Sequence, residues 1–100
     1  MSSDPHAEGV EALRRDVLDG PGTTDRDARE RALRGEGSGA LGPFLRKVRD
    51  ESYRITDGDI AALHAAGYDD DAIFELTVAA AVGASYERLD AARRLIGTDR

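Results

Sequence analysis

Residues 55–96, ITDGDIAALHAAGYDDDAIFELTVAAAVGASYERLDAARRLI, decide the fold because they contain the start signals of two consecutive helices. Thr56 is a favourable N-cap residue, and Asp59 stands three residues later, where a capping box needs a side chain that accepts the Thr56 N–H. Ile55 and Ile60 flank this start at the spacing of a hydrophobic staple. The sequence therefore predicts a helix that begins immediately after Thr56.

This helix should end at Gly67, because a residue without a side chain adopts the left-handed conformation that follows many helices. Asp69 then repeats the start signal, with Asp70 and Asp71 at the positive end of the next helix dipole. We expect that helix to run from about Asp70 to Ile96, a length of roughly 40 Å at about 1.5 Å per residue. A single glycine thus separates two helices.

The middle of the long helix, residues 76–86, is apolar or small around nearly its whole circumference. A surface helix normally keeps one polar face, so this segment needs cover on several sides. The other helices of a 100-residue chain can supply part of that cover, and we expect a second subunit to supply the rest. Gly83 is expected to be a bend or a point of close packing. The predicted interface residues are Val78, Ala80, Ala81, Gly83 and Ala84.

Three shorter helices are expected before residue 55. The run Gly20-Pro21-Gly22 ends the first of them, and Thr24 or Asp25 caps the second. The second helix has few apolar residues and should be the least stable element. Pro43 is tolerated in the first turn of the third helix. The apolar spacing places the three helices at residues 8–19, at about 25–33, and at about 41 to 51 or 53.

Length and composition favour one all-α domain. A chain of 100 residues usually forms a single domain, and its apolar share of 40% comes mainly from Ala, Leu, Val and Ile. The polar residues 1–7 are expected to be disordered. Residues 8–100 should form one helical domain, best defined over residues 55–96. The predicted fold is all-α, with about five helices and a long, apolar C-terminal helix.

The charge balance disfavours nucleic-acid and membrane partners. Charged residues make up 34% of the chain and the formal net charge is −6, so phosphate backbones and anionic lipid surfaces would be repelled. No run approaches the ~18 apolar residues of a membrane span, and the first residues lack the pattern of a signal peptide, so a cytoplasmic location is expected. Arginines of the first third alternate with acidic residues and are expected on solvated helix faces. They are Arg14, Arg15, Arg26, Arg29, Arg31 and Arg34.

The absence of cysteine removes several kinds of chemistry. Without a thiol, the chain cannot form disulfides, zinc–thiolate sites or a thiol nucleophile. The aspartates at positions 57, 59 and 69–71 are explained by helix starts, because the spacing of an EF-hand does not occur. Gly35 to Ala40 match the spacing of a dinucleotide-binding loop, but no strand precedes them. We therefore predict neither a metal nor a cofactor.

Four side chains are weak candidates for acid–base chemistry, namely Glu75, His64, Tyr86 and Tyr53. Glu75 lies in the second turn of an otherwise apolar helix, where burial would raise its pKa and suit proton transfer. The competing interpretation, which we favour, is an exposed or ion-paired carboxylate near the helix start. His64 is expected to be a partly buried or surface imidazole rather than a general base. No base stands at a recognisable spacing from the tyrosine hydroxyls, so no nucleophilic triad is visible.

Two stretches within residues 55–89, ITDGDIAALHAAG and YDDDAIFELTVAAAVGASYERLD, carry a family resemblance. They resemble the C-terminal helical part of the AhpD-like, carboxymuconolactone decarboxylase superfamily. Members of that superfamily similarly carry a helix with the pattern T-D-x-D-[IV]-x-x-L-x-x-x-G, followed by a helix that contains I-x-E-L. The resemblance implies an AhpD-like helical array, and such arrays commonly assemble into trimers or hexamers.

The resemblance does not bring the family's peroxidase activity to this chain. Peroxidase-type members use a CxxCxxxH motif on an upstream helix, and because this chain has no cysteine, thiol peroxidase activity is excluded. Our leading hypothesis is a non-catalytic AhpD-like helical protein that self-associates or docks onto a related AhpD-like partner. The alternative is a small cysteine-independent enzyme of the carboxymuconolactone decarboxylase type, which would use the four acid–base candidates.

Overall fold

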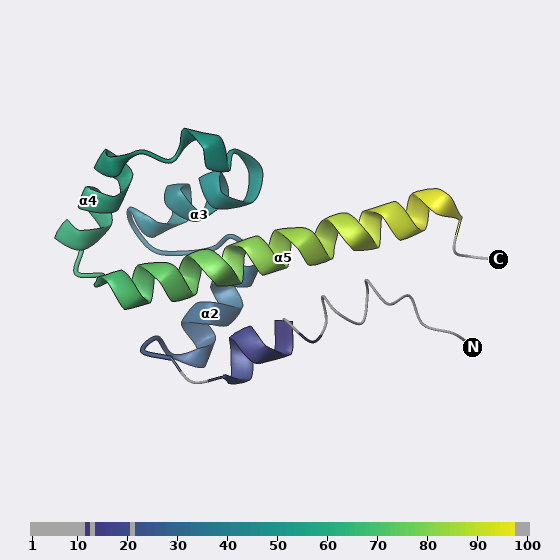
Figure 1. Ribbon diagram of the computed structural model, residues 1–100, viewed down its shortest axis with the longest axis horizontal. Helices are drawn as coiled ribbons and strands as arrows, with labels where there is room; N and C mark the ends of the chain where they lie inside the picture. Colours follow the sequence, from purple (N-terminus) through teal and green to yellow (C-terminus); the bar gives the residue numbers. More distant parts are fainter. Residues whose placement is uncertain (1–11, 13, 21, 98–100) are drawn as a thin grey trace.

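The computed structural model describes residues 12, 14–20 and 22–97, and over these residues the chain contains helices and no strand (Figure 1). This confirms the prediction of an all-α chain. A helical stretch at residues 14–19 is followed by α2 (Arg26–Leu33), α3 (Leu41–Asp50), the 3-10 helix η1 (Ser52–Arg54), α4 (Asp57–Ala65) and α5 (Asp70–Ile96). The predicted disorder of residues 1–7 and the start of the helix expected at residues 8–19 lie outside the described residues.

The helix starts lie where the side-chain signals predicted them. Thr56 Oγ1 accepts the backbone N–H of Asp59 at 3.2 Å, and the Asp59 carboxylate accepts the Thr56 N–H at 2.9 Å, which completes the capping box of α4. Asp25 and Asp69 cap α2 and α5, each accepting the backbone N–H of the residue three positions later. Gly67 follows α4 with a φ of 102°, as expected for a residue without a side chain. Local hydrogen bonding therefore accounts for where these helices begin and end.

α5 is the longest element, and the other helices lie along its N-terminal half. Figure 1 shows α2 on one side of α5 and both α3 and α4 on the other side. The C-terminal half of α5 extends beyond these helices. Within the part of the chain that the structure describes, no helix is long and apolar enough to cross a membrane.

The core lies between α5 and the helices that flank it. It consists of aliphatic side chains, alanines and one aromatic ring, Phe44. α5 contributes one buried face, made of Ile73, Leu76, Ala79, Ala80, Gly83 and Ala84. The preceding elements contribute Leu18, Ala32, Leu33, Leu41, Phe44, Leu45 and Leu63. One face of α5 is therefore covered within the chain.

At Gly83 the backbone of α5 lies directly against the backbone at the end of α2. A Cβ atom built on Gly83 would lie only 2.7 Å from the carbonyl carbon of Leu33 and 2.9 Å from its Cα, and closer still to its oxygen. No side chain fits there, because the obstacle is backbone. The prediction of a close-packing point at Gly83 is confirmed, and it explains how the apolar-poor α2 packs tightly against α5.

Three of the five predicted interface residues are buried inside the chain, and this corrects the sequence-based assignment. Ala80 is 0% exposed, Ala84 is 5% exposed, and Gly83 lies against Leu33. The chain's own helices cover these positions, so they cannot form an outer contact while the fold is intact. Val78 is half-buried and Ala81 is exposed, so these two positions alone retain surface for a partner.

Candidate functional site

The carboxylate of Glu75 makes the most concentrated polar contact in the described structure. Its Oε2 accepts hydrogen bonds from the Thr23 backbone N–H at 2.7 Å and from Thr23 Oγ1 at 3.1 Å. Its Oε1 accepts hydrogen bonds from the Thr24 backbone N–H at 2.8 Å and from Thr24 Oγ1 at 2.7 Å. We call this set the Glu75 latch, because it ties α5 to the loop that leads into α2.

These hydrogen bonds determine the charge of Glu75. The Thr23 backbone N–H, supported by the Thr24 N–H and both hydroxyls, lowers the pKa of Glu75 to about 2, although partial burial opposes the shift. The pKa of a side chain suited to proton transfer at neutral pH would be raised instead. The less favoured interpretation, in which burial raises the pKa of Glu75, is therefore wrong, since donors surround its ionised form.

A glycine and a buried arginine complete the setting of the Glu75 latch. A Cβ atom on Gly22 would lie 2.8 Å from Glu75 Oε1 and 3.1 Å from Nη1 of Arg29, so a larger residue here would displace the ends of these two side chains. Arg29 is buried, and its Nη1 donates to the carbonyl oxygens of Val17 at 3.1 Å and Gly20 at 2.9 Å. The prediction that Arg29 lies on a solvated face is thus wrong.

Sequence reasoning missed Thr23 as a partner of Glu75 and considered Thr24 only as a helix cap. The two threonines lie 52 and 51 residues before Glu75, beyond the reach of any spacing rule for one helix. The one available signal was a carboxylate between Phe74 and Leu76 in an apolar stretch, which implies a polar partner without identifying it.

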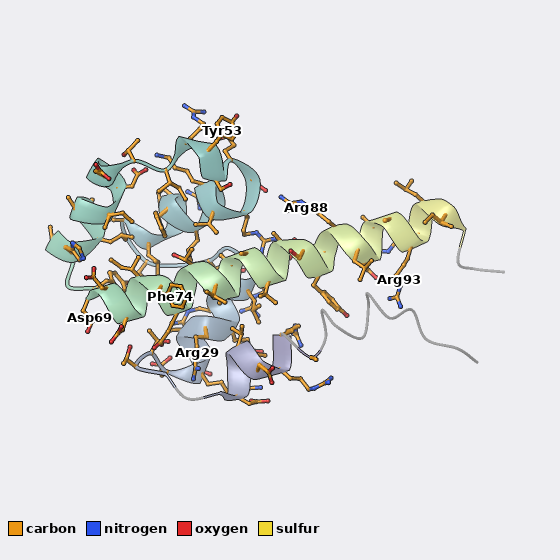
Figure 2. The ribbon with its side chains drawn as sticks, in the orientation of Figure 1. Arg29, Tyr53, Asp69, Phe74, Arg88 and Arg93 are labelled. Atoms are coloured by element: carbon orange, nitrogen blue, oxygen red, sulfur yellow. The ribbon has the colours of Figure 1, made fainter. Side chains whose placement is uncertain are left out.

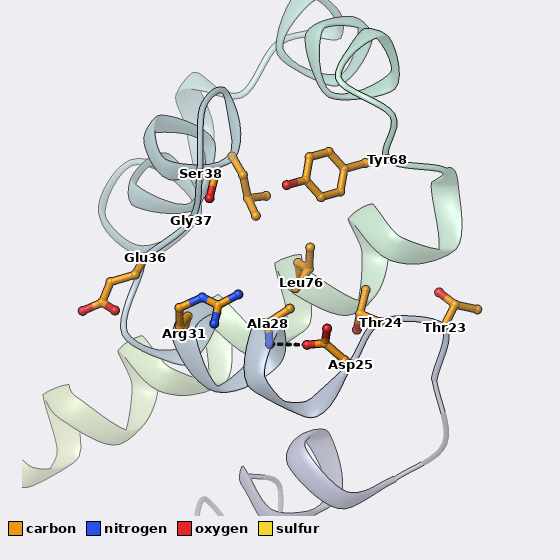
Figure 3. Close-up of a pocket in the computed structure, with 11 residues that line it drawn as sticks. Thr23, Thr24, Asp25, Ala28, Arg31, Glu36, Gly37, Ser38, Tyr68 and Leu76 are labelled. Carbon is orange, nitrogen blue, oxygen red and sulfur yellow. Dashed lines mark hydrogen bonds between the residues drawn. The ribbon is translucent and has the colours of Figure 1, made fainter.

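A hollow of about 260 Å³ adjoins the Glu75 latch. Figure 3 shows Tyr68 on one side of it and Arg31 on another, with the Asp25 cap of Ala28 at its edge. Its lining residues are Thr23, Thr24, Asp25, Ala28, Arg31, Glu36, Gly37, Ser38, Leu41, Tyr68 and Leu76. The lining combines an apolar floor with charges of both signs, and none of the four acid–base candidates belongs to it.

The remaining acid–base candidates lie at separate places. His64 Nε2 and Asp70 Oδ1 are 2.6 Å apart at an exposed corner between α4 and α5. Tyr53 is 83% exposed on η1. Tyr86 lines a different hollow of about 210 Å³, where the Arg14 guanidinium lies 5.8 Å from its ring centre. Among the described contacts, none joins any two of the four candidates.

No metal centre emerges from the described residues either, since no group of three or more His, Cys, Asp or Glu side chains there could hold an ion. The ionised Glu75 is saturated by donors from the threonine loop. In the described structure, Glu75 therefore holds a loop in place and does not form an acid–base pair with another candidate residue.

α5 presents large apolar side chains to solvent, and Figure 2 labels one of them, Phe74. Phe74 is 69% exposed in the second turn, and Leu95 and Ile96 in the last turn are 89% and 71% exposed. Val78 and Ala81 follow Phe74 at spacings of four and three residues, which places them on one helix face. We call the face formed by Phe74, Val78, Ala81, Ser85, Ala92 and Ile96 the outer face of α5.

Comparison with known proteins adds no relative to this description. No family model, no curated protein and no solved structure matches the chain. The functional conclusion therefore rests on the Glu75 latch, the hollows and the outer face of α5.

Proposed function

We propose that this chain is a non-catalytic helical protein with an AhpD-like array, acting by self-association or by docking onto a related AhpD-like protein. The observation that carries the proposal is the exposure of Phe74, which is 69% exposed on the side of α5 opposite the core. Burying a large apolar ring is favourable, and a ring in that position gains this free energy only when a partner covers it. The resemblance of residues 55–89 to the superfamily supports the same function.

The outer face of α5 supports the association hypothesis independently of any family. α5 packs one face against its own chain, and the opposite face carries apolar or small side chains from Phe74 to Ser85, where a surface helix normally carries polar ones. Arg88 lies between Ser85 and Ala92 on this face. Aromatic residues surrounded by small apolar neighbours are the usual energetic centre of a protein interface.

The enzyme alternative receives no comparable support. It needs carboxylate, imidazole and phenol groups that share a cavity and exchange protons. Here His64 is bonded to Asp70, the pKa of Glu75 is lowered to about 2, and Tyr53 lies on a separate surface. We therefore retain association as the proposed function.

Phe74→Glu is expected to weaken self-association about 30-fold or more, because it places a charge where association would bury the Phe74 ring at the centre of the interface. Analytical ultracentrifugation measures this against the 10.7 kDa mass of one chain. Tyr53→Glu is the matched control, since Tyr53 is an aromatic residue on η1 that is more exposed than Phe74, and its loss should leave association unchanged. Figure 2 shows the two rings on different surfaces.

Two outcomes would contradict the proposal. In one, the wild-type chain stays monomeric at every concentration and also leaves a purified AhpD-like protein unbound. In the other, Phe74→Glu and Tyr53→Glu behave alike. Substitutions at Ala80 or Ala84 cannot decide the question, because both side chains are buried and a charge there would break the fold itself.

A further inference from the structure

The side chains on the outer face of α5 differ in size along the helix. Phe74 lies near the start, Ala81 and Ser85 lie near the middle, and Ala92 lies near the end. The bulky ring at one end and the alanine at the other are complementary in size. Small residues at the middle allow two helix backbones to approach closely. This order of side chains fits a second copy of the same face when that copy runs in the opposite direction.

In such an antiparallel pair, Ala81 of one copy lies beside Ser85 of the other. Counting outward from that contact, Phe74 lies opposite Ala92 of the second copy, with Leu95 and Ile96 close by. Each contact occurs twice, because a two-fold axis relates the copies. The pairing covers the large apolar side chains of α5 that are exposed in the single chain, which are Phe74, Leu95 and Ile96.

The charges on α5 favour the same direction. Its first turn contains Asp70 and Asp71, and its last turn contains Arg93 and Arg94. Asp71 and Arg93 lie 22 residues apart (93 − 71), which is about six helical turns, so both flank the outer face on the same edge. Antiparallel pairing brings Asp71 of one copy beside Arg93 of the other, and it also opposes the two helix dipoles favourably.

A parallel pair fails on the same criteria. Its two-fold axis would run along the helices, so the edge with Asp71 and Arg93 would meet the opposite edge of the other copy and the two charges would not be brought together. It would also put Phe74 against Phe74 instead of against the small Ala92.

We propose that two copies of this chain pair through the outer faces of α5 in antiparallel orientation, with Ala81 of one copy beside Ser85 of the other. This pairing rests on the proposed function, because it names a second copy of the chain as the partner of that surface. A second copy fits this surface because the two ends of α5 are complementary in charge and in side-chain size.

Single spin labels test the orientation directly, because the chain has no native cysteine to interfere. Labels are attached to Glu87→Cys and, separately, to Arg94→Cys, both exposed positions outside the outer face, and the distance between copies is measured by pulsed electron resonance. In the antiparallel pair the axial offset between labels is about 12 Å at position 87 and about 33 Å at position 94, at about 1.5 Å per residue. The label distance should therefore be clearly longer at position 94.

The outcomes separate this proposal from the one on which it rests. Equal distances at positions 87 and 94 in a particle of twice the chain mass would overturn antiparallel pairing while leaving association intact. A monomeric chain with no distance between labels would overturn the pairing and the self-association arm together. Binding to a related AhpD-like protein in that case would preserve the docking arm alone.

A charge exchange supplies an independent test of the same pairing. Asp71→Arg should weaken the dimer about tenfold, because each of the two symmetric contacts changes from attraction to repulsion. Combining it with Arg93→Asp should restore the wild-type affinity to within about threefold, since the exchanged charges again face opposite partners. Circular dichroism of each variant measures any fraying of the helix ends separately. An exchange variant that dimerises no better than Asp71→Arg, with helix content intact, contradicts the pairing.

Discussion

Replacing Gly83 by alanine is expected to lower the free energy of unfolding by about 3 kcal/mol, even though alanine is the better helix former. The added Cβ would lie 2.7 Å from the carbonyl carbon of Leu33 and 2.9 Å from its Cα. Backbone atoms cannot rotate away as a side chain can, so α2 must move off α5. That movement opens the core where Ala32 and Leu33 are now buried.

Urea denaturation followed by circular dichroism measures this change. Gly58→Ala is the matched control, because Gly58 is also helical and its added Cβ would meet only Thr56 Oγ1 at 3.6 Å. We expect the control to raise the free energy of unfolding by about 0.5–1 kcal/mol through helix propensity. A Gly83→Ala variant as stable as the wild type would show that α2 and α5 are not in backbone contact at this point.

Replacing Glu75 by glutamine is expected to cost about 2 kcal/mol at neutral pH, the second large effect. The carboxylate accepts two hydrogen bonds on each oxygen from Thr23 and Thr24. An amide offers only one oxygen, and its NH₂ group would face a backbone N–H. The loop that leads into α2 would lose half of its attachment to α5.

The pH dependence of stability provides a second signature of the same group. The pKa of Glu75 is lowered from an ordinary 4.5 to about 2, so its ionised form stabilises the fold above pH 4.5 and this stabilisation disappears as the pH falls toward 2. The shift corresponds to about 2 kcal/mol once partial exposure to solvent is taken into account. Glu75→Gln should lack this part of the acid destabilisation.

Glu36→Gln is the control for both measurements. The Glu36 carboxylate is exposed and lies 3.5 Å from Arg34, so its neutralisation should change the free energy of unfolding by less than about 0.5 kcal/mol. Urea titrations at neutral and acidic pH compare the three proteins. If Glu75→Gln and Glu36→Gln lose the same stability, or if both keep the acid dependence of the wild type, Glu75 does not hold the loop.

The helix boundaries could be predicted because the signals that produce them are local. The capping box of Thr56 and Asp59, the cap at Asp69 and the end at Gly67 involve groups within a few residues of one another. Asp25, one of the two caps considered for α2, was confirmed for the same reason. Each of these features depends only on the chain on either side of it.

The hydrogen-bond partners in the candidate site could not be predicted, because they are residues far apart in the chain. Glu75 finds its donors 51 and 52 residues earlier, and Arg29 binds carbonyl groups at the end of a different helix. A carboxylate in an apolar helix is compatible with a raised or a lowered pKa, and the arrangement of donors decides which occurs. Sequence spacing contains no information about that arrangement.

The all-α class, the main helix boundaries and the absence of thiol chemistry follow from the sequence alone, because capping and helical periodicity act locally and composition acts over the whole chain. That α5 needs cover from a second subunit stays a prediction. Which face of α5 is covered depends on contacts between distant residues. The backbone of Leu33 packs against Gly83, Ala80 and Ala84 are buried beside it, and Phe74 is left exposed.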